Sequence, residues 1–550
     1  MIKTPDLIIS ILYILIIVFV GLWAGLRKRK KSRSSASDEY FLAGKTLRWP
    51  VIGLALFATN ISCIHLVSLA QSGFDTGLLN GNFEWMAAFT LILLALFFVP
   101  FYIRSKVPTL PVFLEKRYNT ACRDWLTVIS IVSAVIIHIA FSLLAGGIVL
   151  ETLFGIDMYV SVTVISVLVA VYTIIGGLRA VVITESIQTI VLVAGAIVIT
   201  AASWLKLGGW TSLVQVLEEH QAMEKISMLR PHGDSSKMPW YAVLLGYPVL
   251  GIWYWCADQT IVQRVLGAKD ENHARVGSLF CGFIKILPVF IFVVPGLMAY
   301  GLAQKGLIDL SSITTVTASG EAVVNSKGIY TLMITQLLPT GLIGIVVAAL
   351  LSGLMSQVSG ALNSISTLVS YDLIKRFRPG VKDKQLVKLG RIAVVVALIF
   401  SVALLPLLNS YESLFNGLND IIAHIAPPIT CVFLLGIFWE KASAKSAQYT
   451  LWMGSLLGVV VFTINKLLPL SIIGKIPFMM MAFYLFCACL VMQVLLSFAY
   501  PVQHTEDSKT LFWRSPWEPL QSKGWKGLGN YKWLSALLVA CVVMLYMLFG

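Results

Sequence analysis

The stretch that decides the fold is WPVIGLALFATNISCIHLVSLAQS, residues 49–72. It is apolar and long enough to cross a bilayer as one helix. Its middle, however, is the polar run ATNIS at 58–62. The Thr, Asn and Ser side chains of this run compete for the backbone hydrogen bonds that would hold a helix together. We therefore expect a transmembrane helix that is broken halfway along.

The chain as a whole has the composition of an all-α membrane protein. Of its 550 residues, 58% are hydrophobic and 12% are charged, about half the charged share of a soluble domain. The mean hydropathy is +0.84. This excludes a soluble enzyme, a disordered chain and a secreted disulfide scaffold. Fourteen apolar stretches predict transmembrane helices, at 7–26, 49–72, 82–103, 124–153, 158–176, 180–204, 240–262, 276–303, 341–373, 385–408, 414–437, 446–466, 475–499 and 533–549.

Lys and Arg residues set the expected orientation. With the N-terminus outside, cytoplasmic loops and helix ends hold 31 of the 41 Lys and Arg residues, nine lie outside, and Lys285 lies within a span. Cytoplasmic loops are enriched in these residues, so we expect a protein of the cytoplasmic (inner) membrane with both termini on the outer side. The basic run at 27–31 follows the first apolar stretch, whereas a signal peptide has its charges in front.

A second interrupted span is expected at 240–262, within the stretch GYPVLG (246–251). Its proline has no backbone N–H to donate to the helix, and its two glycines have no side chains. Each interrupted span opens a block of five helices, 49–204 and 240–437, and the two blocks start on opposite sides. Such an inverted repeat places a substrate site at the two broken helices. The alternative is a pair of ordinary kinks. The matching positions favour a transporter with a ten-helix (5+5) core, an extra helix at 7–26 and further helices in 446–550.

Ionisable side chains at membrane depth are costly and usually functional. Lys285 lies nine residues into its span without an acidic neighbour in that helix, so it needs a partner from another helix or a polar cavity. His65 and Glu84, near the first broken helix and the start of the next helix, are interpreted in the same way. His138 has no partner visible in the sequence and is interpreted as structural. Asp258 is open equally to a structural and a functional role.

The span 341–373 carries serines three or four residues apart, which share one helix face. They are either small residues for close helix packing or oxygen ligands for a small cation. The aromatic run at 253–255 follows the second interruption and would suit either a core or stacking against a sugar ring. No phosphate-binding P-loop, zinc-protease motif or serine-hydrolase motif occurs, so neither an ATP-driven pump nor an enzyme is indicated.

Seven stretches spread over nearly the whole chain match the pattern of a known family. They are DEYFLAGKTLRWPVIGLALFATNIS (38–62), FEWM (83–86), GGLRAVVITESIQTIVL (176–192), WYWCADQTIVQRVLGAKD (253–270), GFIKILP (282–288), LNSISTLVSYDL (362–373) and PPITCVFLLGIFW (427–439). On these residues the sequence resembles the sodium/solute symporter family, and WYWCADQTIVQR points to its sodium/glucose cotransporter branch. The resemblance implies fourteen helices around a ten-helix inverted repeat.

The resemblance also implies a sugar cavity. Hydrogen-bonding groups would come from Asn60, His65, Glu84, Lys285 and Asn419. Tyr254 would be an aromatic gate stacked on the sugar ring, with Phe83 and Trp255 beside it. A site that pairs these groups with hydroxyls rejects a sugar that lacks the matching hydroxyl, because a buried polar group is then left unpaired.

The ion site implied by the resemblance holds sodium with backbone carbonyls at the first break and with groups of the span 341–373. Its members are Ala58, Ile61, Gly353, Ser356 and Gln357. Gln357 stands where the family has Ser or Thr. Its amide oxygen could still bind Na⁺, whereas its NH₂ group could fill or repel the site.

A second sodium site is implied for some members of the family. It would use Glu185 and Ser359 here. Glu185 replaces a shorter aspartate, and Gly360 lacks the hydroxyl found at its position in those members. The resemblance therefore does not predict a second ion.

The expected function is import of a monosaccharide by a sodium-coupled symporter that works by alternating access. One alternative is a sodium-independent sugar facilitator or sensor, which Gln357 suggests. Another is the same fold carrying a different solute, such as myo-inositol. The expected partners are a small sugar and the lipid bilayer, with no nucleic acid.

Overall fold

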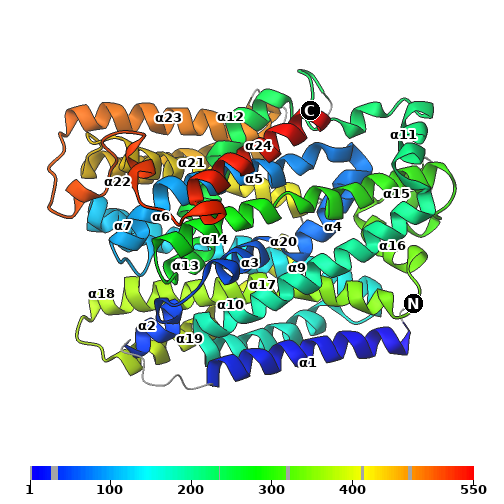
Figure 1. Cartoon of the computed structure of the whole chain (residues 1–550), viewed down its shortest axis with the longest axis horizontal. Coiled ribbons are helices and arrows are strands. Elements are labelled where there is room, and N and C mark those ends of the chain that lie inside the picture. Colours follow the sequence, from blue (N-terminus) through cyan, green and yellow to red (C-terminus); the bar gives the residue numbers. More distant parts are fainter. Residues whose placement is uncertain (1–2, 27–34, 235, 317–321, 410–413, 469–472) are drawn as a thin grey trace.

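The computed structural model describes residues 3–26, 35–234, 236–316, 322–409, 414–468 and 473–550. These residues are almost entirely helical, and most helices run along one common direction (Figure 1). The described strands form a two-stranded antiparallel sheet, β1 (Thr314–Val316) with β2 (Ala322–Val324), and loops connect the remaining elements. Eleven helical stretches of the described chain are long and apolar enough to cross a bilayer. The chain is a multi-pass membrane protein, and the count of fourteen stays a prediction.

Long helices form the body of the molecule. They are α1 (Thr4–Leu26), α3 (Trp49–Asn60), α4 (Cys63–Thr76), α5 (Asn82–Leu93), α8 (Thr120–Ser133), α9 (Phe141–Phe154), α10 (Met158–Leu207), α12 (Trp240–Ile252), α14 (Glu271–Ile284), α15 (Val294–Gln304), α17 (Leu342–Leu368), α19 (Asp383–Ala403), α21 (Leu414–Phe438), α22 (Ala444–Leu467), α23 (Phe478–Ala499) and α24 (Tyr531–Phe549). Five π-helical turns extend some of them, at Leu94–Phe98, Ala134–Ala140, Trp253–Ala257, Val289–Val293 and Val369–Ile374.

Shorter helices connect or cap the long ones. They are α2 (Ala36–Leu42), α6 (Val99–Arg104), α7 (Leu110–Arg117), α11 (Gly209–Glu219), α13 (Gln259–Leu266), α16 (Ile329–Leu337), α18 (Lys375–Phe377) and α20 (Leu405–Leu408). The long α10 is interrupted at Gly177, whose φ of 57° is a left-handed value that favours glycine. A Cβ at this position would lie 2.4 Å from the Tyr40 carbonyl oxygen. The predicted spans 158–176 and 180–204 therefore meet at this glycine.

The first predicted break is confirmed. Helix α3 ends at Asn60, Ile61 and Ser62 have extended backbone, and α4 begins at Cys63. Ser62 caps α4 in a reciprocal arrangement with His65: the Ser62 side chain accepts from the His65 N–H, and the His65 ring accepts from the Ser62 N–H. The cap provides new partners for backbone groups that the interrupted helix leaves free.

The second break was predicted in the wrong place. Helix α12 runs through Pro248 and the whole stretch 246–251, and the backbone leaves the helix only at Asp258. The position follows from the available hydrogen-bond partners. The Tyr102 hydroxyl donates to the Cys256 carbonyl at 2.7 Å, and the Asp258 carboxylate accepts from the Ile261 N–H at 3.1 Å, which caps α13.

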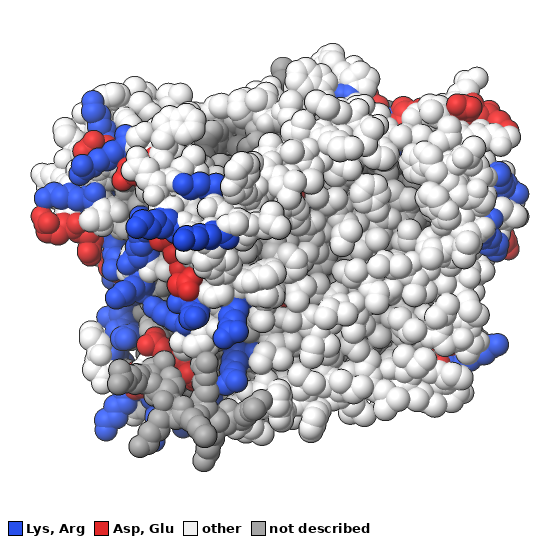
Figure 2. Space-filling view, viewed as in Figure 1, with Lys and Arg blue, Asp and Glu red and all other residues white. Residues whose placement is uncertain are grey.

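The charged side chains lie mainly at the two ends of the helical body. Lys and Arg gather at the left-hand end of the face in Figure 2. The N-terminal end of the chain lies at the opposite, right-hand end (Figure 1). This separation is the one expected for an outside N-terminus, and the orientation stays a prediction. The basic run at 27–31 lies outside the described residues.

Candidate functional site

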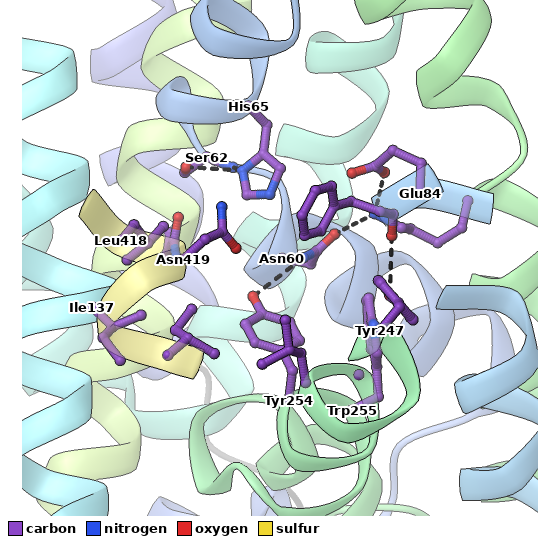
Figure 3. Close-up of a pocket in the computed structure, with 16 residues that line it drawn as sticks. Asn60, Ser62, His65, Glu84, Ile137, Tyr247, Tyr254, Trp255, Leu418 and Asn419 are labelled. Carbon is purple, nitrogen blue, oxygen red and sulfur yellow. Dashed lines mark hydrogen bonds and ion pairs between the residues drawn. The ribbon is translucent and has the colours of Figure 1, made fainter. Parts of the chain in front are cut away.

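One buried cavity lies between the two breaks. All eight side chains that the sequence predicted for the sugar line it: Asn60, His65, Phe83, Glu84, Tyr254, Trp255, Lys285 and Asn419. In Figure 3, the side chains of Asn60, His65, Tyr254 and Asn419 surround one central space. The cavity draws on α3, α4, α5, α12, α17, α21, the π turns at 134–140 and 253–257, and Lys285 at the end of α14. Residues about 360 positions apart in sequence thus converge on it.

The polar centre of the cavity is the Lys285 ammonium group. It forms an ion pair with the Glu84 carboxylate and donates to Asn60 Oδ1 at 2.6 Å. The Lys285 and Glu84 side chains are 1% and 2% exposed. The partner that the sequence required for Lys285 is therefore a carboxylate from another helix, and the pairing makes the burial of both charges tolerable. An ammonium group has three donors, so it can also bind a hydroxyl.

His65 is positioned by the first break. Its Nδ1 accepts from the Ser62 N–H at 3.2 Å and lies 3.1 Å from Ser62 Oγ. Accepting at Nδ1 leaves Nε2 as the protonated nitrogen of the neutral ring. The ring lines the cavity, so the helix cap also holds a hydrogen-bond donor in place for a ligand.

Aromatic rings close one side of the cavity. The Tyr254 hydroxyl accepts from Asn60 Nδ2 at 3.2 Å, and its ring meets Trp255 edge-on at 5.3 Å. Lys285 Nζ lies 5.6 Å from the centre of the Trp255 ring. The sequence analysis missed Tyr247, which also lines the cavity and donates to the Phe83 carbonyl at 3.0 Å. Its spacing of seven residues from Tyr254 puts both on one helix face and could have revealed it.

Three of the five groups predicted to bind sodium converge where α17 meets the first break. Ser356 Oγ lies 2.8 Å from the Ala58 carbonyl oxygen and 3.1 Å from the Gly353 carbonyl oxygen, so its single hydrogen is shared between these two acceptors. A Cβ on Gly353 would lie 3.1 Å from the Cys63 nitrogen and from the Ser62 carbonyl carbon. Glycine at 353 therefore allows α17 to approach the broken backbone. Ile61 provides the extended residue of the break. This concentration of oxygens suits a hard cation.

Gln357 has partners at both ends of its amide. Its Oε1 accepts from Ser142 Oγ at 2.9 Å, and its Nε2 lies 3.3 Å from His138 Nδ1. Gln357 also lines the cavity between the two breaks, a contact that the sequence analysis did not predict. His138, interpreted from sequence as a structural residue without a visible partner, bonds to Asp258 across 3.3 Å.

Of the two residues considered for a second sodium ion, Glu185 already pairs with a positively charged side chain. The Glu185 carboxylate pairs with the Arg264 guanidinium, both fully buried, and also accepts from Thr59 Oγ1 at 3.0 Å. A Cβ on Gly360 would lie 2.3 Å from an Arg264 nitrogen. Ser359 Oγ donates to the Ser356 carbonyl at 3.0 Å. The guanidinium thus lies against both Glu185 and the position at which the second site would require a hydroxyl.

Comparison with known proteins gives consistent matches. The sequence profile of the sodium:solute symporter family matches residues 40–454. Sodium/glucose cotransporter 1 of Ovis aries is 32% identical over 477 residues, which is 83% of this chain and 71% of the relative. A sodium/mannose cotransporter of Bos taurus is 34% identical over 479 residues, 84% of this chain and 80% of the relative.

A solved structure has the same fold. It is a substrate-bound, outward-open Na⁺-coupled sialic acid symporter, with a TM-score of 0.77 and 21% sequence identity. The match covers 92% of this chain and 100% of the symporter.

Proposed function

The chain belongs to the sodium:solute symporter family, and from this premise we propose that it imports a monosaccharide together with sodium across the cytoplasmic membrane. Its relatives are sodium-coupled cotransporters, so it is a transporter and not an enzyme, and sodium is the coupling ion.

The observation that carries the sugar proposal is the composition of the cavity. An ammonium group, a carboxylate, three amides and an imidazole line this cavity together with four aromatic rings. Figure 3 shows the Glu84 carboxylate, the Asn60 and Asn419 amides and the His65 imidazole around the space. A sugar has hydroxyl edges and apolar C–H faces, so it uses both kinds of group. Charge-assisted hydrogen bonds are the strong ones, and Lys285 with Glu84 supplies a donor and an acceptor of this kind.

We propose alternating access as the mechanism, with sodium bound by Ala58, Ile61, Gly353, Ser356 and Gln357. One positive charge moving through 100 mV gains about 2.3 kcal/mol. Sodium at the first break would order the backbone next to Asn60 and His65, and so favour sugar binding. The sugar must then favour sodium binding by the same factor.

We propose one sodium ion per sugar. Glu185 and Ser359 could otherwise contribute to a second site. The Arg264 guanidinium, however, already provides the positive charge that a second sodium ion would bring to Glu185. A cation placed beside it would be repelled at short range in a medium of low dielectric constant.

The experiment that tests the proposal is uptake by proteoliposomes of a panel of solutes, in Na⁺ buffer and in K⁺ buffer. The panel contains glucose, mannose, a sialic acid and myo-inositol. Concentrative monosaccharide uptake only in Na⁺ is the expected result. Equal uptake in both buffers would show a facilitator, sodium currents without uptake would show a sensor, and uptake of myo-inositol alone would show a polyol carrier.

A further inference from the structure

Four buried side chains form a chain of hydrogen bonds from α9 to the second break. Ser142 Oγ lies 2.9 Å from Gln357 Oε1, Gln357 Nε2 lies 3.3 Å from His138 Nδ1, and His138 Nε2 lies 3.3 Å from Asp258 Oδ2. All four residues are at most 4% exposed. The other carboxylate oxygen of Asp258 accepts from the Ile261 N–H at 3.1 Å.

This chain of donors and acceptors has a defined direction. The Asp258 carboxylate can only accept, so His138 Nε2 carries the hydrogen that it donates. Nδ1 of the neutral ring is then an acceptor, and it takes its hydrogen bond from the Gln357 NH₂ group. The Gln357 carbonyl oxygen consequently faces Ser142. The NH₂ group of Gln357 therefore donates to His138 Nδ1.

We propose that Asp258 is a positioning residue for sodium binding: acting through His138, it fixes the direction of the Gln357 amide beside the sodium site. This inference rests on the proposed sodium coupling. Asp258 ends the segment that carries Tyr254, and the Tyr254 ring lies 5.8 Å from the His138 ring. Gln357 is next to Ser356 on α17. The row of four hydrogen-bonded side chains therefore connects the aromatic side of the proposed sugar cavity with the part of α17 that carries Ser356.

Asp258→Asn should reverse the donor and acceptor roles along this row of side chains and still leave a cap on α13. Asparagine caps helices as well as aspartate does, and its single oxygen is used by the Ile261 N–H. Its NH₂ group then faces His138 Nε2, which must become an acceptor. The hydrogen moves to Nδ1, and the Gln357 amide must turn its oxygen toward His138 and its NH₂ group toward Ser142.

The first test reads the His138 tautomer directly. Nitrogen-15 spectra of protein labelled at its seven histidines are compared between wild type and His138→Phe, which assigns the His138 signals. We expect the Nε2–H form in wild type and the Nδ1–H form in Asp258→Asn. A doubly protonated or Nδ1–H ring in wild type, or an unchanged ring in Asp258→Asn, would overturn the proposal.

The second test measures the sodium concentration for half-maximal uptake in wild type, Asp258→Asn, Gln357→Ser and the double variant. Asp258→Asn should raise it about three- to tenfold where Gln357 is present, the range of one net hydrogen bond. In the Gln357→Ser background the same change should have almost no effect, because no amide remains to be turned. Equal shifts in both backgrounds, or none in either, overturn the inference alone. Sodium-independent uptake in wild type overturns the proposed function and this inference together.

Discussion

Among the described residues, two carboxylate–cation pairs with both side chains at most 2% exposed differ in their surroundings. Lys285 and Glu84 line a cavity, and the ammonium group also bonds to Asn60. Arg264 and Glu185 are 0% exposed and line no described cavity. The guanidinium makes two contacts to Glu185 and one to the Thr260 carbonyl. The first pair faces space that a ligand can fill, whereas the second is closed by protein.

This difference shows why burial of a charge does not by itself identify a binding group. The contacts described for the closed pair all go to protein atoms, and they join α10, α13 and α3. The pair in the cavity has capacity left for hydroxyl groups. We therefore expect variants of the closed pair to change stability and variants of the cavity pair to change sugar binding.

The largest effect is expected from Arg264→Met, which leaves the Glu185 carboxylate unpaired in a closed environment. Breaking a buried pair in this way typically costs about 3–5 kcal/mol. We expect a large loss of thermal stability in detergent, measured by the melting temperature of the purified protein. Arg264→Met/Glu185→Met should recover most of it, since no unpaired charge remains. A stable single variant would contradict the structural role of the pair.

Lys285→Ala should mainly weaken sugar binding, whereas Arg264→Met should mainly lower thermal stability. Water that enters the cavity can hydrate the Glu84 carboxylate that is left, so the melting temperature should fall much less than in Arg264→Met. Sugar affinity should fall about 10- to 150-fold, since hydrogen bonds to charged groups contribute about 1.5–3 kcal/mol. Equilibrium binding of the transported sugar measures the effect. Unchanged sugar binding would show that Lys285 is structural and that the sugar lies elsewhere.

Glu84→Gln is a smaller change, because the amide keeps one acceptor and loses the negative charge. We expect about a tenfold loss of affinity for the natural sugar, toward the weak end of the range for a charged hydrogen bond. A deoxy-sugar that lacks the contacted hydroxyl should lose much less. Equal losses across a deoxy-sugar series would mean that Glu84 does not touch the sugar.

The fold could be predicted to the extent that it depends on local chemistry. The polar run at 58–62 has side chains that disfavour a continuous helix, and α3 ends within it. Pro248 suggested a break ten residues before the real one. A helix tolerates proline when other groups satisfy the released carbonyls, and at Asp258 the deciding partner, Tyr102, comes from a distant segment. Such a tertiary contact is invisible in one sequence.

The candidate site was predictable as a set of residues but not as a set of pairs. The resemblance brought together eight residues that line one cavity. Which cation pairs with which carboxylate depends on helix packing. Lys285 was expected to need a partner, yet nothing in the sequence assigned Glu84 to Lys285 and Arg264 to Glu185. The same holds for His138 and Asp258, whose bond joins segments 120 residues apart.

The smallest effects should come from the proposed sodium site. Ser356 Oγ bridges the Ala58 and Gly353 carbonyls, so Ser356→Ala removes one of several oxygens and should raise the half-saturating sodium concentration about three- to tenfold. Gln357→Ser, by contrast, places a hydroxyl directly on the ion face and should lower it. Sodium dependence of sugar uptake in the wild type and both variants measures these shifts. If sugar uptake does not depend on sodium in the wild type but does depend on sodium in Gln357→Ser, then the Gln357 amide occupies the cation's place. If Ser356→Ala leaves the curve unchanged while sodium still drives uptake, the ion binds away from the first break, and the comparison between the two ion pairs must include Glu185 as a sodium ligand.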